Sequence, residues 1–149
     1  MSGPRHDARA RIRTGANWFY WVAGVSALNS YFAHTGGSLT FFIGLGITQL
    51  FDAMAVGYAA APLVLLVNAL LISSCAMVGF YARDSRGLYL TGMVLYALDS
   101  LLFVLFQDPL AIAFHLFALY WMFIGIRGFG LVPATEMAGS EGAASPSAV

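Results

Sequence analysis

Long runs of apolar residues, separated by short polar breaks, divide the chain into five segments. The runs cover roughly residues 16–34, 39–57, 62–82, 88–106 and 109–129. Each is close to the ~20 residues that an α-helix needs to cross a ~30 Å hydrocarbon layer. None shows the alternating polarity of a membrane β-strand. The pattern therefore predicts an all-α fold, a polytopic helical membrane bundle with five apolar helices.

The breaks between the segments have physical causes. Gly36-Gly37 ends the first run. Pro62 and Pro109 stand where a helix can begin, since proline tolerates the first turn and disfavours helix in the residue before it. The loop 83–87 contains two arginines and an aspartate, which cannot lie in hydrocarbon. These positions set the predicted ends of the helices.

Two terminal regions lie outside the apolar segments. Residues 1–14 form an Arg-rich arm with few apolar side chains, and residues 132–149 are rich in Gly, Ala, Ser and Pro. Neither region has a hydrophobic period, so we expect both to be disordered. Residues 15–131 are expected to form a single transmembrane helical domain.

The first segment is open to more than one interpretation. It starts with the aromatic cluster Asn17–Trp21 and places Ser26, Asn29 and Ser30 on one helical face. It could span the bilayer, lie in the membrane plane as an amphipathic helix, or be a signal peptide behind an Arg-rich start. We favour a span because its length and apolar content suit insertion and no clear small-residue cleavage site follows.

The arginines bear on this choice. The chain has seven Arg and no Lys. With five spans, four arginines lie on the amino-terminal side and three on the opposite side, a weak bias towards a cytoplasmic amino terminus. If the first segment does not cross, all seven lie on one side, which fits the positive-inside rule better. We retain five spans, with four as the alternative, and expect a multi-pass protein of a bacterial inner (plasma) membrane.

Composition agrees with a membrane location. Hydrophobic residues make up 60% of the 149 residues and charged residues only 9%, whereas soluble domains carry about 25% charged residues. The net charge of zero argues against nucleic acid as a partner. The expected partners are the bilayer, anionic lipid headgroups at the Arg5–Arg13 arm, and a second copy or another membrane protein.

The second and third segments lie over the fourth and fifth when the chain is shifted by 47 residues. Both halves then read Asp, nine residues, Pro, five residues, and Asn or His. The aligned triplets are Asp52, Pro62, Asn68 and Asp99, Pro109, His115. Overall identity is no better than chance. The spacing nevertheless predicts two helical hairpins of the same orientation, with the 57–61 and 107–108 turns on one side of the membrane and the 83–87 loop on the other.

This repeat brings the rare polar residues of the apolar segments to one depth. From the helical rise of ~1.5 Å per residue, they lie roughly 8–10 Å inside one membrane face and could form a single layer. They are Asp52, Asn68, Asp99 and His115, with Gln49 and Tyr96 one turn before the aspartates as supporting residues. His34, at the far end of the first segment, is expected to lie away from this candidate site.

Two hypotheses remain for the polar layer. A carboxylate within a span costs about 2.5–3.5 kcal/mol on insertion scales, so it is a functional candidate by default, and an imidazole can exchange a proton near neutral pH. One hypothesis is therefore a small proton- or cation-coupled transporter or channel. In the other, which we favour, the carboxylates bond to Asn68, a tyrosine hydroxyl or a helix end. They then fix which helices meet, in a non-catalytic protein that acts through self-association or partners.

No sequence motif indicates catalysis, a metal or a cofactor. Ser100 follows Asp99 and so points ~100° away around the helix, and a Gly-x-Ser-x-Gly pattern is absent. The HExxH spacing of a metal site is also missing. The single Cys75 cannot close an internal disulfide. We therefore expect no cofactor and no metal, and a non-enzyme rather than an enzyme.

Overall fold

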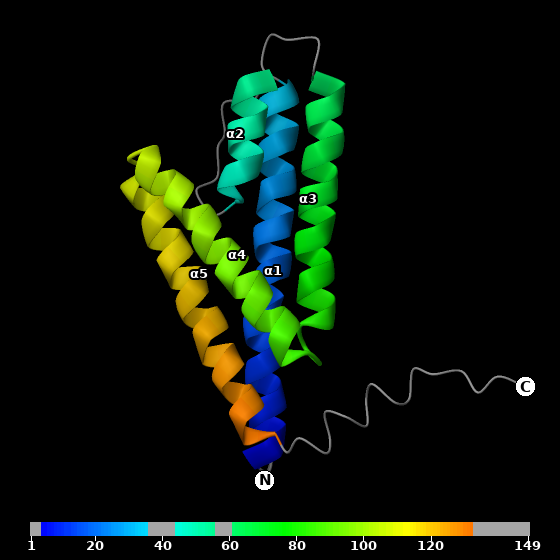
Figure 1. Cartoon of the computed structure of the whole chain (residues 1–149), viewed down its shortest axis with the longest axis vertical. Coiled ribbons are helices and arrows are strands. Elements are labelled where there is room, and N and C mark those ends of the chain that lie inside the picture. Colours follow the sequence, from blue (N-terminus) through cyan, green and yellow to red (C-terminus); the bar gives the residue numbers. More distant parts are fainter. Residues whose placement is uncertain (1–3, 36–43, 56–60, 133–149) are drawn as a thin grey trace, which may run out of the picture.

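The computed structural model describes residues 4–35, 44–55 and 61–132. The described chain is all α with five helices, as predicted (Figure 1). They are α1 (Pro4–Thr35), α2 (Gly46–Ala55), α3 (Ala61–Tyr81), α4 (Arg86–Leu105) and α5 (Pro109–Arg127), which continues into the 3-10 turn η1 (Gly128–Leu131). The expected disordered tail, apart from Val132, lies outside the described residues.

Three of the helices, α3, α4 and α5 with η1, are long and apolar enough to cross a membrane. Their ends agree closely with the predicted ends because side chains cap them. Ser85 accepts a hydrogen bond from the first turn of α4. Asp108 accepts from the backbone N–H groups of Leu110 and Ala111, and Pro109 occupies the first turn of α5. Such caps satisfy N–H groups that have no partner within the helix.

The expectation of a disordered amino-terminal arm is wrong for its described part. α1 begins at Pro4 and continues through the Arg-rich region into the aromatic cluster. Proline suits a first helical turn, and Asp7 lies where the helix dipole favours a negative charge. Ala8 and Ile12 are buried, so one face of the arm packs against the bundle. The stripe is narrow, and the arginines on the other faces make the segment polar on average, so the sequence did not predict a packed helix there.

The expected spanning helix over residues 39–57 is also wrong. The two described residues before Gly46 are not helical, and the ten residues of α2 rise only about 15 Å. A Cβ on Gly44 would lie 2.7 Å from the Asn29 amide nitrogen, and one on Gly46 would lie 2.8 Å from the Phe103 ring. Because both positions are glycine, the start of α2 can lie close against α1 and α4.

α2 runs in the same direction as α1. Near its start the Leu45 N–H donates to Ser26 Oγ at 2.7 Å, and further along Ser30 Oγ donates to Asp52 Oδ2 at 2.7 Å. The contact points therefore advance together along both helices. α3, α4 and α5 then alternate in direction, so α2 and α3 follow the same up-and-down order as α4 and α5 (Figure 1).

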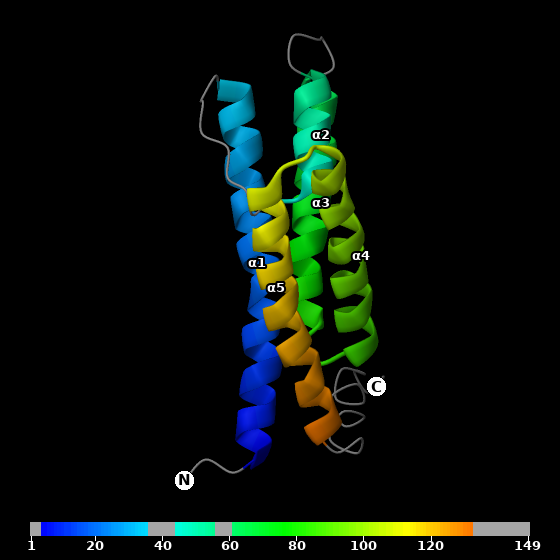
Figure 2. The same cartoon turned by 90° about the vertical axis from the view of Figure 1, so that its left-hand side faces the viewer.

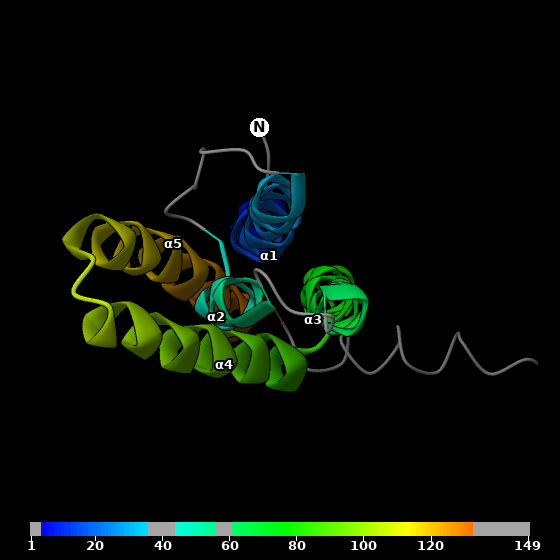
Figure 3. The same ribbon diagram turned by 90° about the horizontal axis from the view of Figure 1, so that it is seen from above.

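Seen from above, α2 lies inside the arrangement formed by the other helices (Figure 3). It contacts α1, α3 and α4. α1 in turn packs along α3 and α5 and against η1. This placement buries a helix that is too short to cross, which explains why the polar groups near it are enclosed by protein.

All seven arginine positions lie towards one end of the bundle, the lower part of Figures 1 and 2. Four are in the first turns of α1, two flank the α3–α4 turn, and Arg127 ends α5. The carboxyl end of α1 and the α4–α5 turn lie towards the other end. The sequence had linked a one-sided arginine distribution to a first segment that does not cross. In the structure the same distribution arises because α2 does not reverse the chain direction of α1.

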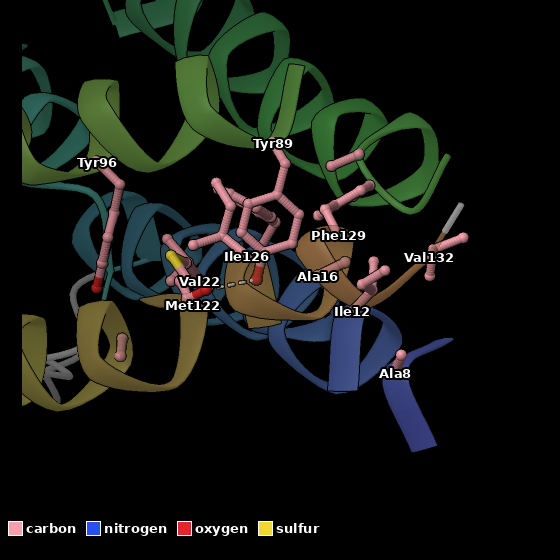
Figure 4. Packing of buried hydrophobic residues seen from close by; sticks show 13 residues of the cluster. Ala8, Ile12, Ala16, Val22, Tyr89, Tyr96, Met122, Ile126, Phe129 and Val132 are labelled. Atoms are coloured by element: carbon pink, nitrogen blue, oxygen red, sulfur yellow. Dashed lines mark hydrogen bonds between the residues drawn. The ribbon is translucent and has the colours of Figure 1, made fainter. Parts of the chain in front are cut away.

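A hydrophobic core fills the arginine-bearing part of the bundle (Figure 4). Tyr89 of α4 is fully buried, and its ring makes edge contacts with Phe19 and Phe129. Its hydroxyl donates to the Met122 carbonyl oxygen at 2.9 Å. Gly15 allows α1 to approach α5 at this level, since a Cβ there would lie 2.9 Å from the α5 backbone.

The outer faces of α3, α4 and α5 are covered by large apolar side chains. Leu70, Leu98 and Tyr120 are each more than half exposed, and similar residues follow along all three helices. A soluble monomer rarely exposes so extensive an apolar surface. Together with the lengths of these helices, the surface indicates a membrane location.

Cysteine labelling from either side of the membrane tests the arrangement of α1. In a Cys75→Ala background, His6→Cys and Gly87→Cys should react with an impermeant reagent from one side, and Thr35→Cys from the other. If α1 crosses the membrane once, its two ends lie on opposite sides, whereas the α3–α4 turn lies on the same side as His6. The Cys75→Ala parent should stay unlabelled. Reaction of His6→Cys and Thr35→Cys from the same side would contradict a crossing α1.

Candidate functional site

Asp99 of α4 bonds to the start of α2. Its Oδ2 accepts from the Gly46 N–H at 2.7 Å, and its Oδ1 accepts from the Ile47 N–H at 2.9 Å. The first N–H groups of a helix have no partner within that helix, and the helix dipole favours a negative charge beside them. Asp99 therefore acts as a cap supplied by another helix, and it holds the beginning of α2 inside the bundle.

His115 of α5 faces the same carboxylate. It is fully buried, and its Nε2 lies 3.7 Å from Asp99 Oδ2. Its Nδ1 lies 2.8 Å from the Ala111 carbonyl oxygen, and because a carbonyl only accepts, Nδ1 carries the proton of this bond. Nε2 has no hydrogen-bond partner among the described residues. In the neutral ring, the Nε2 lone pair faces the Asp99 carboxylate, which also only accepts hydrogen bonds.

Two aromatic rings enclose the His115 imidazole. Tyr96, a supporting residue of the predicted site, stacks on it with ring centroids 4.7 Å apart and planes at 19°. Phe103 packs at a centroid distance of 4.6 Å. Both rings pack against the imidazole and keep it directed towards Asp99.

Asp52 forms a second cluster that joins α1, α2 and α3. Ser30 Oγ donates to its Oδ2 at 2.7 Å, and Asn68 Nδ2 donates to its Oδ1 at 2.6 Å. The Asn68 amide nitrogen also lies 3.0 Å from Ser30 Oγ. His34 Nδ1 is 3.6 Å from Asp52 Oδ1. The carboxylate is thus held by groups from the helices on both sides of α2.

The structure groups the four predicted site residues as two pairs and not as one layer. Asp52 contacts Asn68, and Asp99 lies beside His115. Asp99 meets the first turn of α2, whereas Asp52 belongs to the last turn, roughly 8 Å further along the helix. Gln49 is half-buried on α2 between these points. Within the described part of the chain, no three His, Cys, Asp or Glu side chains gather as a metal ion would require.

Sequence reasoning missed the contributions of α1. Ser26 and Ser30 share a helical face, and this was the available signal that the face turns towards other polar groups. His34 was expected to lie away from the site, which is wrong because it reaches Asp52. A spanning helix over 39–57 would have returned Asp52 to the opposite membrane face. Since α2 runs parallel to α1, Asp52 instead lies near the carboxyl end of α1.

A mainly apolar cavity of about 420 Å³ adjoins Asp99. Its walls come from α1, α2, α3 and α4 and include Phe19, Cys75 and Leu95, and Asp99 is the charged residue among them. Leu95 is 59% exposed, so the cavity reaches the outer surface between α3 and α4. Asp99 thus forms part of the wall of this cavity.

Substitution of Asp99 tests its capping role. Asp99→Leu removes both acceptors and should strand two buried N–H groups, at roughly 1–3 kcal/mol each. Asp99→Asn keeps one acceptor oxygen and should cost less. Thermal unfolding in detergent should therefore rank wild type above Asn and Asn above Leu. Asp84→Leu, at an exposed position of the α3–α4 turn, is the matched control, and identical melting of all four proteins would contradict the cap.

Similarity to known proteins adds no family or activity to this geometry. No protein-family model, no curated protein and no solved structure matches the chain.

Proposed function

We propose that the chain is a multipass membrane protein in which α1, α3, α4 and α5 cross the bilayer and α2 is a half-helix that enters from one side. The apolar outer faces of α3, α4 and α5 support this topology. The arginine-bearing end would be cytoplasmic by the positive-inside rule. Helix ends are tolerated at membrane depth only where protein or water satisfies them, and the Asp99 carboxylate does so for α2.

In this proposal the buried carboxylates hold helices together and the protein is non-catalytic. The observation that carries it is that both oxygens of Asp52 and both oxygens of Asp99 accept a hydrogen bond from another element of the chain. A buried carboxylate with its hydrogen bonds made is a stable structural group, whereas removing its partners is costly. The Asp99 series above is the experiment that tests this role.

The protein would act through self-association or a partner at α3. Ala69 and Ser73, four residues apart, are both exposed on the outer face of this helix. Small residues at this spacing let two membrane helices approach closely. Because the pair faces outward, the helix that it would receive belongs to a second copy or to another membrane protein.

Energy transfer between labelled copies tests self-association. Donor and acceptor dyes at Gly87→Cys, in a Cys75→Ala background, should show transfer in dilute proteoliposomes. Ala69→Leu and Ser73→Leu should lower it several-fold, because bulky side chains keep the two α3 helices apart. Thr91→Leu, at an exposed position of α4, should leave it unchanged. Transfer that is absent in the parent, or equal in every variant, would contradict association through α3.

A proton- or cation-coupled transporter or channel is the second candidate. One observation favours it: the buried Nε2 of His115 lies 3.7 Å from Asp99 Oδ2 without a hydrogen-bond partner among the described residues. A mainly apolar cavity of about 420 Å³ adjoins Asp99. Proton uptake by the pair would also weaken the negative charge that caps α2, which would link protonation to the position of this half-helix. Transport would also require a second copy, because four crossing helices leave little room for a solvated path.

Proton flux into vesicles separates the two candidates. If the pair conducts protons, reconstituted wild-type protein should acidify dye-loaded vesicles under a pH gradient. Asp99→Asn should abolish the flux by removing the charge, and His115→Phe should do so while keeping an aromatic ring in the stack. His6→Phe, at an exposed position outside the pair, should keep the flux. Wild-type protein without flux above empty vesicles, or flux indifferent to both substitutions, would end the transport hypothesis.

A further inference from the structure

At the arginine-bearing end, a cleft of about 590 Å³ lies between α1 and the α3–α4 turn. Its lining residues are His6, Arg9, Ala10, Arg13, Arg83 and Asp84. Three arginines and one aspartate give the cleft a net positive charge before His6 is counted. The two walls come from segments some seventy residues apart in the sequence, so only the fold assembles this group of charges.

Helical spacing brings the α1 residues to one wall. His6, Arg9, Ala10 and Arg13 stand at i, i+3, i+4 and i+7, which is one face of a helix. The opposite side of this part of α1 contains the buried Ala8 and thus packs on the protein. The arm that the sequence indicated as disordered is therefore an ordered wall of the cleft, to which it contributes Arg9 and Arg13.

Arg83 closes the cleft from the other wall and is held in place. Its Nη2 donates to Asn17 Oδ1 at 3.0 Å, and its guanidinium carbon lies 5.3 Å from the centroid of the Tyr20 ring. Its Nε is buried without a hydrogen-bond partner among the described residues. A guanidinium that is already positioned loses less conformational freedom when it binds an anion.

The ligand chemistry that fits this cleft is a phosphate. Guanidinium groups bind phosphate oxygens with paired, charge-assisted hydrogen bonds, and basic pockets at the cytoplasmic ends of membrane helices are typical sites for anionic headgroups. α3 exposes Phe80 (58%) and Tyr81 (52%) just before the cleft. These exposed side chains stand two and three residues before Arg83 and provide apolar surface at the same end of α3, as an amphipathic ligand requires. A free phosphate ion has no apolar part that could bind to that surface.

We propose that this cleft binds the phosphate headgroup of an anionic membrane lipid, with Arg9, Arg13 and Arg83 as its ligands and the acyl chains along the outer face of α3. The inference rests on the proposed topology, which places this end at the headgroup level. The cysteine-labelling test of that topology is independent of lipid binding, so the two can fail separately.

Native mass spectrometry of the full chain in detergent tests the site. The protein is titrated with phosphatidylglycerol, with phosphatidylcholine of the same acyl chains, and with inorganic phosphate as a competitor. Phosphatidylglycerol should bind more tightly than phosphatidylcholine, and inorganic phosphate at equal concentration should not displace it. Equal binding of the two lipids would overturn the proposal. Displacement of phosphatidylglycerol by inorganic phosphate would show that the cleft binds a free phosphate and not a lipid headgroup, and would overturn the proposal.

Matched variants locate the binding to the cleft. Arg13→Gln and Arg83→Gln should each weaken phosphatidylglycerol binding about five-fold, because each removes one charged contact to the headgroup phosphate. Arg86→Gln changes the same charge in the same turn but lies outside the cleft, and it should bind as wild type. Equal weakening by Arg86→Gln would show that only the general surface charge matters and would overturn the site.

Asp84→Asn controls for the possibility that the arginine variants lose binding only because they fold poorly. It removes the negative charge from the cleft and should tighten phosphatidylglycerol binding by a few-fold, a gain that misfolding cannot produce. Its melting temperature should match wild type, since Asp84 is exposed. Unchanged or weaker binding by Asp84→Asn, together with unchanged binding by Arg13→Gln, would overturn the proposal.

Discussion

A helix that begins inside a membrane bundle leaves its first N–H groups without partners, and lipid offers none. In this chain the Asp99 carboxylate accepts hydrogen bonds from two of these groups. The arrangement of the other elements depends on this bond. It allows α2 to start deep in the bundle and to run beside α1 in the same direction. The Asp52 cluster then forms near the carboxyl end of α1, and the arginine positions collect at the opposite end.

The sequence predicted the three candidate spans well because their signals are local. A proline at the first turn of α5 and the charged loop between α3 and α4 mark helix ends wherever the rest of the chain lies. The segment 39–57 was different. Hydropathy reports only how apolar a segment is, and a half-helix enclosed by protein is as apolar as a spanning one. The start of α2 is held by a contact with α4 between Gly46 and Asp99, which are 53 residues apart.

At the candidate site too, the sequence predicted features that depend on spacing within a hairpin, but not those that depend on how distant helices pack. Equal spacing within the two halves predicted that Asp52, Asn68, Asp99 and His115 would lie in one layer. The structure instead brings Asp52 to Asn68 and Asp99 to His115. The two pairs do not lie in one layer. The predicted depth of each residue was counted from the turn of its own hairpin, but the two hairpins are displaced relative to each other along the bundle (Figure 1). Ser30 and His34 lie beside Asp52 for a related reason. The direction of α2 relative to α1 decides which end of α1 meets Asp52.

The two parts of the bundle are held by different kinds of contact, and this difference has a mechanical consequence. Around Tyr89, interlocking rings and closely approaching backbones fill the space, and a packed core of this kind resists small displacements. Around α2, cohesion comes from a few directional bonds whose donors and acceptors can exchange partners. The core around Tyr89 would therefore stay rigid, and the helices around α2 would move relative to it. A change in the bonds of Asp52 or Asp99 would splay the ends of α2 and α3 while the arginine-bearing end stayed fixed.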